Sequence, residues 1–357
     1  MHIDFHHPVT YICARAAGFD PEDAEIVAHC AQYVDDATTD GIVRFDNGAL
    51  YARSATAHRM LDYKNFQALP SRLVWVPFHF VPGNGGLRCG DAPDGGFIER
   101  MITRPGSPVA EDMVRAAIVS QDRPYGLYRL GVVAHVYADT WAHQGFAGVS
   151  HEVNRVSDVE RDGKKDPFFE RKVTRFFEDV MRRTMQPLGH GEALTYPDLP
   201  FLVWSYTDGH GRRIERDNAA IFVEAADALC RVFKRYLARD ADLEVDGLPE
   251  RVRGEIEKLF RGLTETKARP RYLDWLRAVR DDRFGVGGRE LPVLAKGVKT
   301  WKDQALPPAD PSDSRQRVYR YSEEFLSSHW KRFHDAAKAH RRSTVDDILP
   351  RYGILAA

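Results

Sequence analysis

The sequence predicts a mainly α-helical protein with a few short extended segments. Helix starts are indicated where a capping side chain precedes a first turn, at Asp20–Pro21, Ser107–Pro108 and Asp217–Asn218. A long helix expected at 125–148 is apolar on most of its circumference, which indicates that it is buried. The run 74–80 is rich in β-branched and aromatic residues, but its proline limits it to an edge strand or an extended loop.

The expected elements follow in order along the chain. The first seven residues are expected to be extended, and the first helix runs from Pro21 to about Thr38. Further helices are expected at 108–121, 125–148, about 168–185, 217–239, 249–262, 270–281 and 322–342. Gly-rich or Pro-rich connections are expected at 83–96, 285–288 and 306–311.

Composition is that of an ordinary globular protein. Of 357 residues, 43% are hydrophobic and 29% charged, and the formal net charge of -1 does not point to a nucleic-acid binder. The N-terminus lacks the pattern of a secretory signal, so the expected compartment is the cytoplasm, with signal-independent export left open. We expect a helical metal-binding catalytic domain at 1–240 and a helical extension at 241–357, either separate or packed into the same domain.

Four scattered cysteines without a Cys-x-x-Cys pair argue against a thiolate metal site, so any metal must be held by His and carboxylates. His135, Asp139 and His143 lie at i, i+4 and i+8 of one predicted helix, on one face. Burying a carboxylate between two imidazoles is costly unless each is paired, and a divalent metal would pair them. Asp139 would then share its oxygens between one ion held with His135 and another held with His143. The alternative is a buried His-Asp hydrogen bond.

Two further pairs of candidate ligands precede that helix. Asp4 and His6 point to the same side of an extended N-terminus, although a frayed polar terminus would explain them equally. Asp35 and Asp36 end a predicted helix, where acidic side chains oppose the helix dipole. Residues that conflict with local helix preferences are often found at functional sites, so Asp35 or Asp36 is a candidate ligand or general base. The alternative is a solvated helix end.

Two isolated histidines complete the set of candidates. His79 lies between two phenylalanines, where a satisfied core histidine is the alternative to a metal ligand. His190 lies between Gly189 and Gly191, which let the backbone bend toward a site, or form a plain surface turn.

Four motifs together resemble an uncharacterised bacterial family of unknown function, over most of residues 1–235. They are Asp4 to His6, Gln32 to Asp36, Pro77 to Phe80 and His135 to Gln144. The His-x-x-x-Asp of His135 and Asp139 is also similar to the zinc-dependent phospholipase C and P1 nuclease group. That resemblance implies a multi-helix bundle in which His135 and Asp139 bind zinc, Asp139 bridges two ions, and Asp4 and His6 act as the metal-binding chain start. This sequence departs from that group in lacking a clear second His-x-x-x-Glu pair and a secretion signal.

The expected function is hydrolysis of a phosphoester, with a diester such as a phospholipid or nucleic acid favoured. Two divalent ions, zinc or alternatively manganese or iron, would lower the pKa of a bridging water that attacks phosphorus in line. The expected metal ligands are a subset of Asp4, His6, Asp35, His79, His135, Asp139 and His143. Asp36 or His190 would handle the proton. We expect no stable complex with nucleic acid; peripheral contact with a membrane and the oligomeric state stay open.

Two rival functions remain. An HD-type nucleotide phosphohydrolase is also helical and rich in His and Asp, but it needs an adjacent His-Asp pair, and here only His334–Asp335 fits. A non-catalytic binding protein would use a metal merely to staple helices, with a closed coordination sphere.

Overall fold

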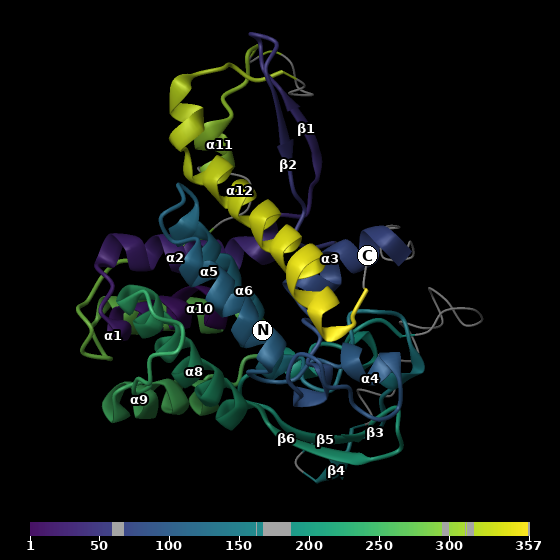
Figure 1. The fold of residues 1–357 in the computed structure, drawn as a ribbon. Helices are drawn as coiled ribbons and strands as arrows, with labels where there is room; N and C mark the ends of the chain where they lie inside the picture. The colour runs from purple at the N-terminus through teal and green to yellow at the C-terminus, as the bar shows by residue number, and fades with distance from the viewer. Residues whose placement is uncertain are drawn as a thin grey trace.

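A computed structural model describes residues 1–58, 68–161, 163–166, 187–294, 300–310, 312 and 318–355. Within these residues the protein is mainly α-helical with two small sheets, as the sequence predicts (Figure 1). The α-helices are α1 (Thr10–Ala17), α2 (Pro21–Asp36), α3 (Ala68–Phe78), α4 (Phe97–Met101), α5 (Pro108–Val119), α6 (Gly126–Ala142), α8 (Asn218–Ala238), α9 (Glu250–Gly262), α10 (Ala268–Arg280), α11 (Trp301–Ala305) and α12 (His329–Arg342). The helix predicted at about 168–185 lies outside the described residues.

Helix α6 lies at the centre of the molecule. It packs against α2, α5, α8 and α12, and within it only Leu127 is not buried (Figure 1). The apolar circumference read from the sequence is therefore covered on all sides by other helices. Burial of each Val or Leu side chain contributes roughly 1.5–3 kcal/mol, which explains why this helix anchors the core.

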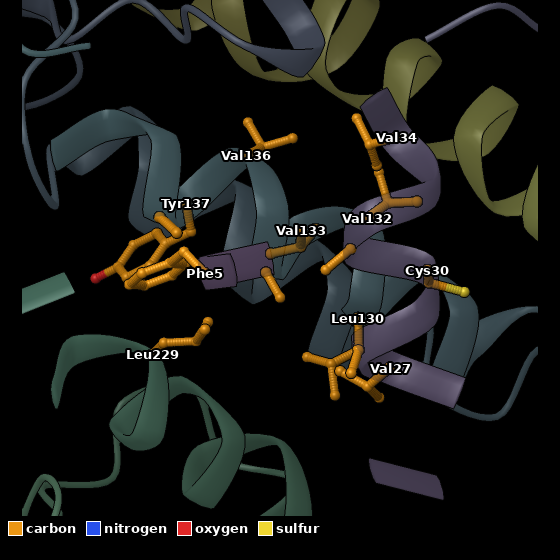
Figure 2. Packing of buried hydrophobic residues seen from close by; sticks show 14 of the residues in the cluster. Phe5, Val27, Cys30, Val34, Leu130, Val132, Val133, Val136, Tyr137 and Leu229 are labelled. Carbon is orange, nitrogen blue, oxygen red and sulfur yellow. The ribbon is translucent and has the colours of Figure 1, made fainter. Parts of the chain in front are cut away.

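The closest packing around α6 is with α2. Val27 of α2 lies beside Leu130 of α6 (Figure 2). Gly131 makes this approach possible, because a Cβ there would lie 2.3 Å from the Cβ of Cys30. The helices that carry Asp35, His135 and Asp139 thus pack closely because residue 131 has no side chain.

The N-terminal segment is helical, so the prediction of an extended chain start is wrong. A π-helical turn, η1 (Phe5–Val9), runs into α1. Pro8 has no N–H to donate to a preceding turn, and the N–H of Thr10 bonds the carbonyl of Phe5 across the wider turn. The buried ring of Phe5 packs against the rings of Phe222 and Phe260, and this tertiary burial fixes the segment as a helix.

The run 74–80 is likewise not a strand, because α3 includes it up to Phe78. A short apolar run cannot be assigned to strand or helix from periodicity alone, and here helix packing decides. Pro77 lies in the last turn of α3, where its missing N–H removes one backbone hydrogen bond shortly before the helix ends. The carbonyl of Pro77 accepts a hydrogen bond from Nε2 of His340 on α12, at 2.7 Å.

The strands form two separate antiparallel sheets. A hairpin of β1 (Gly41–Arg44) and β2 (Leu50–Arg53) connects α2 with the segment before α3 and lies beside α12 (Figure 1). The second sheet has the order β4-β3-β5-β6. Its strands are β3 (Ser157–Arg161), β4 (Lys164–Lys165), β5 (Val203–Thr207) and β6 (Arg213–Asp217). Strand β6 leads directly into α8, whose first turn is capped by the side chain of Asp217, as predicted.

The C-terminal region packs into the same hydrophobic core as the N-terminal region. Trp275 of α10 and Phe333 of α12 belong to one buried cluster with Phe5 and Val133. The helix predicted at 322–342 is divided, because a 3₁₀ segment η7 (Glu323–Ser327) precedes α12 and Ser328 caps the latter. Among the described residues, no helix combines the length and the apolar character needed to cross a membrane.

Candidate metal centre

The core of the molecule holds a cluster of histidines and aspartates around one end of α6. In three groups, the potential ligand atoms lie within 4.8 Å of one another. The first group is His6, Asp35 and His135; the second is His79, His135 and Asp139; the third is His143, His190 and Asp198. His6 lies in η1, Asp35 in α2, and His135 and Asp139 in α6. His79 follows α3, His143 is the C-cap of α6, and His190 and Asp198 precede β5.

Asp139 is the centre of this cluster, and its two oxygens face different partners. Its Oδ2 lies 3.2 Å from Nε2 of His135 and 3.4 Å from Nδ1 of His79. Its Oδ1 lies 3.2 Å from Nε2 of His6 and 2.7 Å from the amino nitrogen of Met1. A carboxylate placed in this way can bridge two cations, one on each oxygen.

Backbone carbonyls fix the orientation of the imidazoles in the second group. Nδ1 of His135 lies 2.8 Å from the carbonyl of Ala31, and Nε2 of His79 lies 2.9 Å from the carbonyl of Thr56. A carbonyl only accepts, so each of these nitrogens donates its proton there. In neutral rings, Nε2 of His135 and Nδ1 of His79 therefore present lone pairs, and they face each other at 3.2 Å. Two lone pairs at this distance repel each other, and a proton or a metal ion between or beside them removes the repulsion. Burial lowers the pKa of His135, but Asp139 and Asp35 outweigh burial and raise it, so this position attracts positive charge.

The third group repeats this pattern. Nδ1 of His143 donates to the carbonyl of His79 at 2.8 Å, and Nδ1 of His190 donates to the carbonyl of Leu194 at 2.8 Å. Their Nε2 atoms face the two oxygens of Asp198, at 3.3 Å and 3.5 Å. Both rings thus present the free nitrogen of a metal-binding tautomer beside a carboxylate.

His6 has the least satisfied ring of the cluster. It is fully buried, and among the described residues neither of its nitrogens meets hydrogen-bond geometry. Its ring stacks on that of His135 with centroids 3.8 Å apart, and its Nε2 points at Asp139. A buried polar atom without a partner is costly, and a metal ion on the Oδ1 side of Asp139 would satisfy this one.

The electrostatics of the cluster lower the pKa of Asp139 and Asp198, and burial lowers the pKa of His6, His79 and His190. Burial alone would raise the pKa of Asp139, but His143, the Met1 amino group and His135 hold it well below its ordinary value. Burial lowers the pKa of His6 well below 6.5 and lowers that of His190 to about 4. Ionised carboxylates and neutral imidazoles are the protonation states in which these side chains bind metals.

A positive charge already stands between the carboxylates. The buried amino group of Met1 lies 2.7 Å from Asp139 and 3.1 Å from Asp198. Burial lowers the pKa of this amino group, but Asp139, Asp198 and Asp35 outweigh burial and raise it to about 11. The buried carboxylates of Asp139 and Asp198 thus attract positive charge.

Most predicted ligands meet in this cluster: His6, Asp35, His79, His135, Asp139 and His143 are all members. His143 differs from the prediction, because it caps α6 and belongs to the third group, while His6 takes the second oxygen of Asp139. His190, predicted to handle protons, also lies in the third group. Asp36 lies beside the cluster, where its Oδ2 accepts a hydrogen bond from Gln32 at 3.4 Å.

The structure does not place Asp4 with the metal-binding candidates. Its Oδ2 accepts a hydrogen bond from Nε of Arg271 at 2.6 Å, and within the described part of the chain it belongs to none of the three groups. Helical rather than extended backbone is the reason, since in a helix residues two apart point in different directions. The structure pairs Asp4 with Arg271 and does not group it with His6, and a role of Asp4 as metal ligand stays a prediction.

Sequence reasoning missed Asp198. It follows Pro197 in a short 3₁₀ turn, Tyr196–Asp198, and lies eight residues after His190, a spacing that no regular element turns into a ligand pair. Only the folded chain brings it to His143.

Solvent exposure differs across the cluster. The side chain of Asp35 is 34% exposed and that of His190 is 20% exposed, whereas the other imidazoles and Asp139 are at most 5% exposed.

Comparison with known proteins yields one match. The family model described as a family of unknown function (DUF6765) matches residues 1–348. This agrees with the resemblance to an uncharacterised family drawn from the four motifs. No curated protein and no solved structure matches the chain. The likeness to zinc-dependent phospholipase C and P1 nuclease therefore remains an expectation from the sequence.

Proposed function

We propose that this chain, which belongs to the family of unknown function DUF6765, is a metal-dependent hydrolase that cleaves a phosphoester, with a diester favoured. The observation that carries the proposal is the convergence of unprotonated imidazole nitrogens on shared carboxylates. His135 and His79 turn their second nitrogens toward each other and toward Asp139, each held by a backbone carbonyl on its other side. This arrangement fits cations better than it fits a network of hydrogen bonds.

The residues present fit two divalent ions. One ion would be held by His79, His135, Asp35 and Oδ2 of Asp139, and another by His6 on the Oδ1 side of Asp139. The third group offers a further set of one carboxylate and two imidazoles. Mixed His and Asp ligation suits zinc, and manganese or iron as alternatives.

The charge of the loaded site would favour an anionic substrate. The pKa values of Asp139 and Asp198 lie well below the ordinary value, and burial lowers those of His6 and His79. The three carboxylates of the groups carry at most three negative charges, so two divalent ions would leave the centre positive. When bound, such ions activate water as a nucleophile and offset the charge that develops on phosphate oxygens. The partly exposed Asp35 marks the side from which a substrate would approach.

The remaining roles belong to side chains of the chain itself. Asp36, next to Asp35 in the sequence, would exchange a proton with a water molecule or a leaving group. The carbonyls of Ala31 and Thr56 hold the rings of His135 and His79 in one tautomer, so these ligands need no reorganisation when an ion binds.

The rival functions are less well supported by the contacts. The His334–Asp335 pair needed by an HD-type enzyme is engaged elsewhere, since Nδ1 of His334 accepts from the backbone N–H of Ser54 and Asp335 accepts from Tyr51 and Lys331. A purely structural metal staple predicts a closed site, whereas the side chain of Asp35 is one-third exposed.

The test is metal content and hydrolysis measured on the same preparations. Elemental mass spectrometry should find at least two equivalents of divalent metal in the full chain. Hydrolysis of bis(p-nitrophenyl) phosphate should disappear on chelation, return on addition of zinc or manganese, and be absent in Asp139→Asn. Well-folded protein without stoichiometric metal, or full activity after complete chelation, would overturn the proposal.

A further inference from the structure

We propose that Arg216 and Asn218 are positioning residues that bring His143 and Asp198 together, and so assemble the third ligand group. The inference rests on the proposed metal-dependent function and names the residues that build one part of its site. Neither residue belongs to any of the three ligand groups within the described part of the chain, and both lie at the junction of β6 with α8.

Arg216 holds the end of α6 that carries His143. Its guanidinium is buried and donates hydrogen bonds to the carbonyls of Ala142 at 2.7 Å, Trp141 at 3.2 Å and Gln144 at 3.3 Å. These carbonyls lie on both sides of His143. Those of Trp141 and Ala142 belong to the last turn of α6, where carbonyls lack partners within the helix, and Gln144 follows the C-cap. A cation at this end also offsets the negative pole of the helix dipole.

Asn218 holds the turn that carries Asp198. It is fully buried, and its Nδ2 donates to the carbonyls of Tyr196 at 2.7 Å and Leu199 at 2.8 Å, one on each side of Asp198. Its Oδ1 accepts from the indole N–H of Trp204 at 3.1 Å, which fixes the amide in this orientation. The amide therefore fastens the turn on both sides of the carboxylate.

Arg216 and Asn218 bond two segments that are far apart in the sequence. His143 and Asp198 are separated by 55 residues, yet Nε2 of the former lies 3.3 Å from Oδ1 of the latter. Arg216 and Asn218 are two residues apart on one rigid junction, so fixing both segments to it fixes the separation of the two ligands. The planar fork of arginine, which can bond several acceptors at once, suits this role in a way that lysine does not.

The buried guanidinium has a cost that a purely structural helix cap would not need. Its Nε lacks a hydrogen-bond partner among the described residues, and burial lowers the pKa of Arg216. A Gly at the residue after a helix satisfies such carbonyls without burying a charge. Here the end of α6 is instead bonded by Arg216, a charged residue two positions before Asn218, which bonds the turn of Asp198.

The experiment compares Arg216→Met and Asn218→Ser with Arg212→Met, a matched change of an exposed arginine from the same hairpin that pairs with Asp208. Metal equivalents are measured by elemental mass spectrometry, and cobalt(II) titrations followed by visible absorption resolve the binding steps. We expect Arg216→Met and Asn218→Ser to weaken one binding step by about 10–100-fold while the other steps stay unchanged. Arg212→Met should match the wild type, and Arg216→Lys should restore part of the affinity.

The outcomes separate this inference from the proposed function. Wild-type protein that binds no metal would overturn both. Metal binding by wild type with unchanged titrations of folded Arg216→Met and Asn218→Ser would overturn the positioning role alone. If Arg216→Met does not fold, Arg216→Lys and Asn218→Ser decide by the same titrations. Equal weakening of every binding step in these variants would also count against the positioning role, because it indicates a general loss of structure.

Discussion

The carboxylate of Asp4 and the guanidinium of Arg271 form an ion pair 2.6 Å long in which both side chains are buried. Arg271 also donates to the carbonyl of Glu265 and contacts Nδ1 of His2 at 3.1 Å. One side chain of α10 thereby fastens the chain start, which carries His6, to the C-terminal half of the protein. Asp4, which the sequence offers as a metal ligand, thus anchors the chain start beside the proposed metal centre.

Asp4→Asn should therefore destabilise the protein without removing metal. Breaking a buried ion pair leaves an unpaired charge, and we expect the free energy of unfolding to fall by about 3–5 kcal/mol. The matched control is Asp274→Asn, which removes a partner of Arg277 on the exposed side of the same helix and should cost less than about 1 kcal/mol. Urea unfolding and elemental mass spectrometry check both. Loss of metal from Asp4→Asn at unchanged stability would restore Asp4 as a ligand.

The neighbouring histidines His6 and His7 should respond differently to the same substitution. His6→Gln removes a nitrogen aimed at Oδ1 of Asp139, so we expect loss of bound metal and a fall in phosphodiesterase activity of more than about 100-fold. His7 instead shares a hydrogen bond with the hydroxyl of Tyr272 at 3.0 Å, which a glutamine can also make. His7→Gln should keep its metal. Equal metal content in both variants would exclude His6 from the site.

Removal of metal should lower thermal stability. An ion that binds only the folded chain stabilises it by about 2.7 kcal/mol when its free concentration is 100 times the dissociation constant. We expect chelation to reduce Tm and added zinc to restore it, as measured by differential scanning calorimetry. The Tm of the Asp139→Asn protein should not change with either treatment. A wild-type Tm that stays the same after chelation would contradict the buried metal centre.

Gly131 should be intolerant of even a methyl group. Its Cβ would lie 2.3 Å from Cβ of Cys30 and 2.6 Å from the carbonyl of Val27, so α6 and α2 would have to separate. We expect Gly131→Ala to cost about 1–3 kcal/mol in unfolding free energy. Gly254→Ala on α9 meets nothing within 4 Å and should instead stabilise by up to about 1 kcal/mol. Urea unfolding of the two variants measures the contrast, and similar values for both would refute the close helix contact.

His334 should contribute to acid denaturation. Burial, with the charges of Lys338 and Arg53, lowers its pKa to about 3, so the folded protein leaves it neutral while the unfolded chain binds a proton below pH 6.5. Stability is then unaffected above pH 6.5 and decreases as pH falls from 6.5 toward 3, by up to about 1.4 kcal/mol per pH unit.

The variant His334→Asn isolates this contribution. Its Oδ1 can accept the N–H of Ser54 as Nδ1 of His334 does, but it cannot titrate. Between pH 8 and 4, the unfolding free energy of wild type should therefore fall relative to that of the variant once the pH drops below 6.5. Parallel pH profiles would mean that His334 is protonated in the folded state.

Local patterns in the sequence determined much of the helical framework. The caps at Asp20, Ser107 and Asp217 are present as predicted, because a side chain that bonds the next turn needs no distant partner. The buried character of α6 also followed from its apolar circumference. The His-Asp spacing on that helix placed His135 beside Asp139 for the same reason: residues four apart share a face.

Only the tertiary structure decided which side chains meet across distant segments. The run 74–80 became part of a helix and the chain start became helical, because packing against neighbouring helices outweighs the local preference of short segments. Asp4 went to Arg271, 267 residues away, and Asp198 came to His143 from a turn without any sequence signal. Contacts between remote residues depend on how helices pack, and periodicity along one segment carries no information about them.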